Sequence, residues 1–254
     1  MRKGFTLVEL SIVLVIIGLL IGGILTAQSM INTAKISAEV RQIGQFDAGV
    51  MSFKTKYGYM PGDAPAFGGN GDGLIDYPDR SLDAFGCEQG NFWHDFNPQE
   101  FTVSATCNVP GIAAISDGPS KTVPPSQIGK ANSFIVASAL SLNTSYADAA
   151  PPKNFYAILD SSQMQLPFAA WYRALPTTSS NSATTPADTL ALDAKMDDGL
   201  ANSGNVLSGN VNAYYTIYIN PISTCSQGAN YQVQNSGYEC TPLIRIGAQT
   251  GDPQ

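Results

Sequence analysis

Charged residues are scarce in this chain, and that scarcity limits the classes of function open to it. Lys, Arg, Asp and Glu make up 13% of the 254 residues, and there is a single histidine. Acidic residues outnumber basic ones, which gives a formal charge of −7, and no basic cluster interrupts the sequence. Such a surface repels phosphate backbones, so nucleic-acid binding is disfavoured.

Catalytic motifs are also missing. The sequence has no GxSxG, no HExxH and no Gly-rich phosphate-binding loop, the patterns that would indicate common hydrolytic or nucleotide-dependent chemistry. His94 is followed by Asp95, but successive residues rarely face each other and no nucleophile stands beside them. We therefore expect a protein that is not an enzyme and that requires no cofactor.

Charge is absent altogether from residues 10–34, an apolar run of 25 residues. This exceeds the roughly 20 residues that a bilayer-spanning helix requires. A cleaved signal peptide is the alternative, but the run is longer than the apolar part of such peptides, and the small residues near Ala27 form a poor cleavage site. We expect a retained helix with Arg2 and Lys3 in the cytoplasm and the bulk of the chain outside.

Cysteines occur only beyond this apolar run, at positions 87, 107, 225 and 240. An even number in an exported chain indicates two disulfides. Three pairings are open, and proximity in sequence favours Cys87–Cys107 and Cys225–Cys240. The lack of a CxxC pair and the single histidine argue against zinc.

The helical pattern continues past the apolar run. Apolar residues then recur every three or four positions, which predicts one buried face of an amphipathic helix: Ile36, Val40, Ile43, Phe46, Val50 and Phe53. Lys35, Glu39, Arg41, Gln42 and Gln45 are expected mostly on the opposite side. The predicted helix covers residues 5–54, about 75 Å at 1.5 Å per residue, and the Pro and Gly residues of 57–63 end it.

Shorter elements are expected further on. The β-branched and aromatic content of residues 155–159, 211–219 and 243–246 predicts strands. Residues 89–96 and 188–196 read as short helices, and residues 128–142 as a helix or as a helix and a strand.

The N-terminal sequence KGFTLVEL, residues 3–10, followed by a long apolar helix, resembles the class III signal of type IV pilins and type II secretion pseudopilins. Two further stretches resemble this class. Residues 192–199 with 203–206 (LDAKMDDG and SGNV) are similar to a segment of larger prepilin-type proteins, and Cys225 with Cys240 is similar to the disulfide-closed loop of type IV pilins.

The resemblance implies how the chain is processed and assembled. A prepilin peptidase would cut between Gly4 and Phe5, and the new Phe5 amine would be methylated. The protein would wait in the inner membrane, with its N-terminus cytoplasmic, until an assembly platform moves it into a periplasmic or extracellular filament of pilin subunits. Many members have Pro where this chain has Thr26, so local helix melting during assembly would rely on Gly18, Gly22 and Gly23.

The implied architecture is an α+β, pilin-like fold in which the long N-terminal helix packs on a small antiparallel β-sheet with large loop insertions. We divide the chain into a leader at 1–4, a transmembrane and filament-core half-helix at 5–30, an amphipathic half-helix at 31–54 and a globular head at 55–254.

Glu9 lies at the start of the predicted membrane segment. A carboxylate there is energetically costly, so we expect it to have a partner or a function. One interpretation places it at the interface, where a carboxylate favours the positive end of the helix dipole. The resemblance implies another, in which cleavage at Gly4-Phe5 creates an amine that pairs with Glu9 of the same or a neighbouring subunit and sets register.

Two acidic stretches are candidate metal sites, the first of them for calcium. Residues 69–79 approximate a calcium loop with Asn70, Asp72, Asp76 and Asp79 as ligands, although Gly68 replaces the usual first Asp. A solvated Gly/Asn/Asp turn explains the same residues. Asp193, Asp197 and Asp198 form the second cluster, which a turn at a helix end also explains. Ca²⁺ is the one ligand that these patterns suggest.

The sequence thus predicts a structural subunit of a type IV pilus or of a type II secretion pseudopilus. The alternative is a pilin-like minor subunit at the tip, acting as an adhesin or an uptake binding module.

Overall fold

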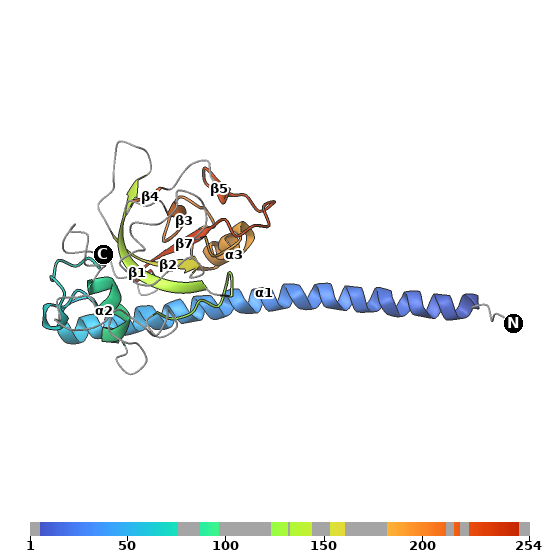
Figure 1. Cartoon of the computed structure of the whole chain (residues 1–254), viewed down its shortest axis with the longest axis horizontal. Helices are drawn as coiled ribbons and strands as arrows, with labels where there is room; N and C mark the ends of the chain where they lie inside the picture. The colour runs from blue at the N-terminus through green and yellow to red at the C-terminus, as the bar shows by residue number, and fades with distance from the viewer. Residues whose placement is uncertain are drawn as a thin grey trace.

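The computed structural model describes residues 6–75, 87–96, 123–131, 133–143, 153–160, 182–211, 216–218 and 224–248. One long helix carries a head on its C-terminal half, while its N-terminal half projects alone (Figure 1). The elements in chain order are α1 (Leu7–Tyr57), η1 (Pro65–Phe67), α2 (Cys87–Phe96), β1 (Ser133–Asn143), β2 (Lys153–Asp160), α3 (Pro186–Met196), β3 (Val206–Val211), β4 (Thr216–Tyr218), β5 (Ser226–Gln227), β6 (Asn230–Tyr231) and β7 (Thr241–Arg245).

The predicted long helix is confirmed as α1, a 51-residue helix that extends to Tyr57. It ends at Gly58, whose φ of 80° is left-handed and whose N–H donates to the Lys54 carbonyl at 2.8 Å. Glycine adopts this conformation without a Cβ clash, which is why helices commonly end on it. Of the predicted helix-breaking residues at 57–63, the first glycine, Gly58, is therefore the one that ends α1.

The sheet of the head is antiparallel for most of its length, as predicted, and it closes on itself. Within the described residues, β1, β2, β7, β3 and β4 follow one another around a closed barrel. The pairs β1–β2, β2–β7, β7–β3 and β3–β4 are antiparallel, whereas the end of β1 pairs with β4 in parallel, Leu142 opposite Ile217. The α+β class is confirmed, and closure leaves fewer free strand edges than an open sheet would.

Most of the expected short elements are present. Residues 155–159 and 243–246 lie mainly in β2 and β7, and the two short helices are α2 and α3. The single strand expected at 211–219 is wrong, because β3 and β4 are antiparallel with Asn210 opposite Tyr218. The chain therefore reverses inside that segment.

The predicted apolar stripe of α1 packs on the head. Ile36, Ile43, Val50 and Phe53 are buried, and Val40 and Phe46 pack against the core from partly exposed positions. This face meets β-strand residues and the aromatic residues of α2. Trp93 is fully buried, and its ring lies 4.8 Å from that of Phe46. Each such buried side chain contributes about 1.5–3 kcal/mol.

Two acids lie on the same buried face, and for Glu39 the predicted solvent position is wrong. Glu39 is fully buried, and its Oε2 accepts hydrogen bonds from the Gln127 N–H at 2.6 Å and the Ser126 hydroxyl at 3.0 Å. Burial raises the pKa of Glu39 to about 7. Asp47, also buried, accepts the Gly247 N–H at 2.9 Å. Buried carboxylates with specific donors thus fix the rotation and the axial position of α1 against the head.

Candidate functional site

The start of α1 is closed by a capping box. Thr6 has an extended backbone, and its hydroxyl accepts the Glu9 N–H at 3.3 Å. In return, the Thr6 N–H and the Thr6 hydroxyl donate to Glu9 Oε2 at 2.8 and 2.9 Å. The arrangement satisfies backbone groups at the first turn that would otherwise lack partners.

The capping box changes the interpretation of Glu9. Thr6 already binds this carboxylate in the unprocessed chain, so Glu9 has a hydrogen-bond partner before any cleavage, and its pairing with a Phe5 amine stays a prediction. Both bonds go to Oε2, and within the described residues no hydrogen bond reaches Oε1. Thr6 was missed as a site residue, although the spacing Thr-x-x-Glu before an apolar run is a readable signal of such a cap.

Gly4 and Phe5, the predicted cleavage residues, lie outside the described residues. Cleavage between them, and pairing of the new Phe5 amine with Glu9, therefore stay predictions.

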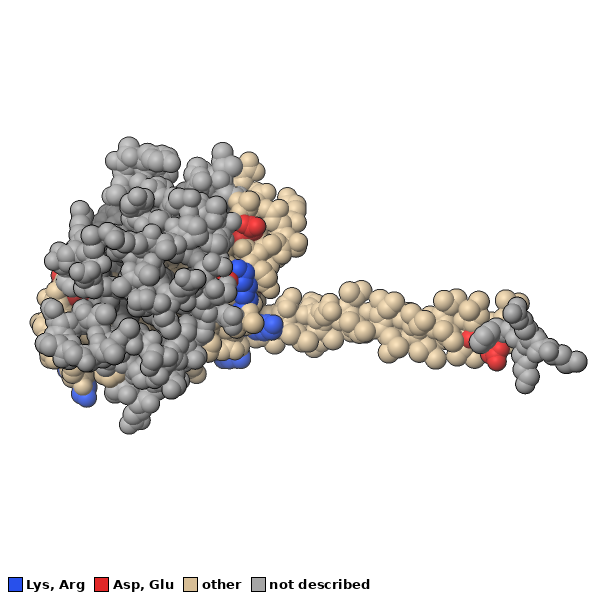
Figure 2. Space-filling model, in the orientation of Figure 1, with Lys and Arg blue, Asp and Glu red and all other residues tan. Residues whose placement is uncertain are grey.

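The half of α1 that follows is exposed, and it packs on none of the other elements that the structure describes. An 18-residue window near its start has a mean hydropathy of 2.7, and none of that window is buried. Figure 2 shows the projecting helix as a rod without charged side chains between a red acidic spot near its N-terminal end and the head. Glu9 is the one acid in the described sequence before Lys35. The Thr26 hydroxyl donates to the Gly22 carbonyl at 3.0 Å, and α1 continues unbroken through this point. A helix of this length and composition is sufficient to cross a bilayer.

The three acids at the end of α3 are brought together. Asp193, Asp197 and Asp198 each offer an oxygen within 4.8 Å of the others. Protein donors already bind these carboxylates. Asp193 accepts the Tyr231 hydroxyl at 2.7 Å and the Gly199 N–H at 3.0 Å. Asp197 accepts the N–H groups of residues 205 and 206, and Asp198 accepts the N–H of residue 200 and the hydroxyl of residue 203.

Asp193 is the centre of this acidic cluster. It is fully buried, and burial, together with the charges of Asp198 and Asp197, raises its pKa to about 6. Gly204, at φ 78°, lies so close to Asp197 that an added Cβ would collide with the carboxylate. The cluster therefore ties α3, the turn after it and β6 together through hydrogen bonds, and a metal ion there stays a prediction.

The predicted calcium loop at 69–79 is described only in part, because Asp76 and Asp79 lie outside the described residues. Asn70 and Asp72 bind each other: the Asn70 amide donates to Asp72 at 3.1 Å, and the Asp72 N–H donates to Asn70 at 2.9 Å. Asp63, which the sequence did not single out, is buried beneath them. Its carboxylate accepts the N–H groups of Gly71, Asp72 and Gly73 at 2.7, 3.1 and 3.0 Å.

These hydrogen bonds make the described part of the loop an Asp63-centred turn. Burial raises the pKa of Asp63, while the N–H donors act in the opposite direction. The calcium prediction for Asn70 and Asp72 remains untested by this geometry.

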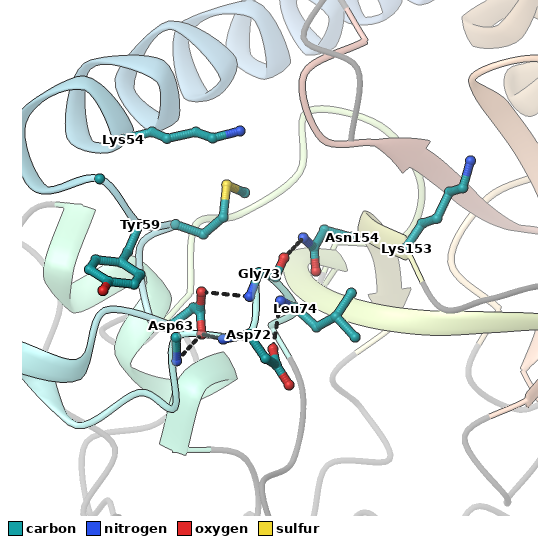
Figure 3. Close-up of a pocket in the computed structure, with 11 residues that line it drawn as sticks. Lys54, Tyr59, Asp63, Asp72, Gly73, Leu74, Lys153 and Asn154 are labelled. Atoms are coloured by element: carbon teal, nitrogen blue, oxygen red, sulfur yellow. Dashed lines mark hydrogen bonds between the residues drawn. The ribbon is translucent and has the colours of Figure 1, made fainter.

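A cavity of about 540 Å³ lies beside this turn, at the end of α1 that is far from the projecting half. Figure 3 shows the end of α1, the turn and the start of β2 around it, with the side chains of Lys54, Tyr59 and Lys153 on different sides. The cavity thus brings together two cationic side chains, an aromatic ring and the carboxylates of Asp63 and Asp72 at the distal end of the head.

The C-terminal disulfide is confirmed. Cys225 and Cys240 are joined across 15 positions, with their Cα atoms 5.0 Å apart. Both lie in a small buried cluster with Ala201 and Tyr231. Cys107 and the side chain of Cys87 lie outside the described residues, so that pairing stays a prediction.

Comparison with known proteins gives one finding, at the N-terminus. Residues 1–25 match the family model described as the prokaryotic N-terminal methylation motif. No curated protein and no solved structure matches the chain. The motif points to a structural subunit and not to an enzyme, and it implies processing by a prepilin peptidase and assembly with other pilins. The chain thus begins with the class III signal of type IV pilins and pseudopilins, which supports a pilin-like or pseudopilin precursor.

Proposed function

We propose that the protein is a filament subunit of a type IV pilus or a type II secretion pseudopilus. Its α1 helix anchors it in the inner membrane before assembly and forms filament core afterwards. The observation that carries this proposal is the exposed apolar half of α1, most of which lies within the methylation motif. An unpartnered helix of this length requires lipid or other apolar helices around it.

Glu9 serves assembly in this proposal through its charge. After cleavage, the Phe5 amine is a cation that arrives beside the carboxylate, and the two groups pair within or between subunits. In an apolar filament core, an unpaired carboxylate would cost several kcal/mol. A subunit that is out of register therefore loses this pairing, which is how Glu9 selects the correct axial position.

Two matched variants separate the charge of Glu9 from its role as a helix cap. Glu9→Gln removes the charge but retains an acceptor that a capping box tolerates. Thr6→Val weakens the cap and retains the charge. Both are expected to insert in the membrane, and only Glu9→Gln is expected to be lost from sheared filaments of the host. Equal loss of both variants would show that the cap, and not the charge, is required.

A minor tip subunit with a binding role is the second candidate, and the distal cavity is the observation that favours it. Lys54, Tyr59 and Lys153 line this cavity at the end of the head that a tip subunit would turn outward. Immunogold labelling of filaments distinguishes the two roles. Gold only at filament ends supports the tip role, and gold along the shaft supports the main proposal.

A further inference from the structure

One side of the head faces the N-terminal, projecting half of α1. Figure 1 places α3 and the segment 224–240 on this side of the head. Lys35 is exposed on α1 just before Ile36, the first buried residue of the helix. The amine of Lys195, at the end of α3, lies 2.5 Å from the hydroxyl of Ser37. Figure 2 shows cationic side chains gathered where α1 leaves the head.

Large apolar side chains are exposed on the same elements. Leu200 follows α3 and is 41% exposed, and Val233 and Tyr238, in the disulfide loop, are 48% and 44% exposed. Lys35, Lys195, Leu200, Val233 and Tyr238 are called the basal face below. Tyrosines beside long cationic side chains are typical of the boundary between bilayer and water, because each has an apolar body and a polar end.

The length of the apolar helix places the basal face at this boundary. A hydrocarbon core of about 30 Å takes about 20 residues at 1.5 Å each. Counted from Leu10, it ends near residue 30. Lys35 lies five residues beyond, about 8 Å, which matches the outer edge of a head-group layer about 5–8 Å deep. The Lys35 side chain is long enough to reach back into that layer.

Asp197 and Asp198 follow Lys195 in the sequence, and both are hydrogen-bonded within their own turn. Both oxygens of Asp198 accept hydrogen bonds from residues 200 and 203, and Asp197 accepts the N–H groups of residues 205 and 206. The Lys195 amine donates to the Ser37 hydroxyl on α1. Its charge therefore lies where α3 meets α1, on the side of the head from which the apolar half of α1 projects.

We propose that the basal face rests on the membrane that α1 crosses, with Lys35 and Lys195 bound to the phosphates of anionic phospholipids. Leu200, Val233 and Tyr238 contact the apolar edge of the head-group layer. This docking holds the head in one orientation while the subunit waits for assembly, and extraction into a filament breaks it. The inference rests on the proposed role of α1 as the membrane anchor.

Hydrogen exchange of the full chain in lipid nanodiscs tests the docking. One set of discs holds zwitterionic lipid only, and the other includes an anionic phospholipid. Residues 232–239 are expected to exchange more slowly in the anionic discs, while residues 58–62 at the distal end exchange equally in both. Removing two lysines near an anionic surface weakens docking about 30-fold, so Lys35→Gln with Lys195→Gln should remove the difference.

The matched control is Lys54→Gln with Lys56→Gln, which removes the same charge from the distal end of α1 and should retain the difference. Equal exchange of residues 232–239 in both lipids overturns the proposal. Protection that depends on the number of chains per disc, and not on lipid charge, also overturns it and assigns the face to a second copy. A chain that fails to enter discs at all contradicts the membrane anchor itself, which is a separate result.

Discussion

Replacement of Glu39 by Gln is expected to stabilise the protein above neutral pH. The pKa of this buried carboxyl is raised from 4.5 to about 7, so the folded state retains a proton that the unfolded state has lost. The contribution of the Glu39 carboxyl to the free energy of unfolding is therefore at its highest below pH 4.5, and it falls as the pH rises to about 7. A shift of this size corresponds to about 3 kcal/mol. The Gln127 N–H and the Ser126 hydroxyl can donate to a glutamine oxygen as they do to Glu39.

Urea unfolding of the full chain in detergent measures this effect, with fluorescence of the buried Trp93 as a signal. Between pH 4 and pH 8 the wild type should lose stability more steeply than Glu39→Gln, and the two should agree near pH 4. Glu239→Gln, which changes a partly exposed carboxylate, is the control and should follow the wild type. A Glu39→Gln protein that is less stable than the wild type at pH 8 would refute the reasoning, because it would show that the carboxylate is stabilised in its charged form.

Three further changes test the packing and the acidic cluster. Gly49→Ala places a methyl group against the Phe96 ring and should cost about 1–3 kcal/mol in urea unfolding; Gly18→Ala, which meets nothing within 4 Å, should not destabilise the head. Tyr231→Phe removes a buried hydrogen bond to Asp193 and should cost about 1–3 kcal/mol, with much less effect when Asp193→Ala is already present. If calcium binds the Asp193 cluster, EGTA should lower the melting temperature of the wild type and leave that of Asp193→Asn unchanged. An equal shift in both proteins, or none, would remove the ion from this site.

The long helix was predictable because its determinants are local. An apolar run followed by residues spaced three and four apart specifies a helix and its buried face, and Gly58 supplies the stop within the sequence itself. Glu39 was placed wrongly for a physical reason. A sequence pattern normally places a charged residue in solvent. The groups that donate hydrogen bonds to Glu39 belong to residues 126 and 127, more than 80 positions away, so no local pattern reveals them.

The head was less predictable because its contacts join distant segments. The strand expected at 211–219 contains no Gly or Pro to mark the reversal between β3 and β4. Closure of the barrel depends on parallel pairing of Leu142 with Ile217, and no local pattern encodes such a long-range register.

The candidate sites divide in the same way. The motif around Glu9 is a contiguous sequence, and comparison with known proteins confirms it. Its capping partner Thr6 was equally readable. The role of Asp63 depends on three N–H groups presented by a turn, and that of Asp193 on Tyr231 from β6, so neither role could be read from spacing.

The N-terminal mass of the protein from its native host tests the central claim most directly. We predict a mature chain that begins at Phe5 with a methylated amine, lacking residues 1–4. A chain that retains Met1, or one cut near Ala27, would contradict the account.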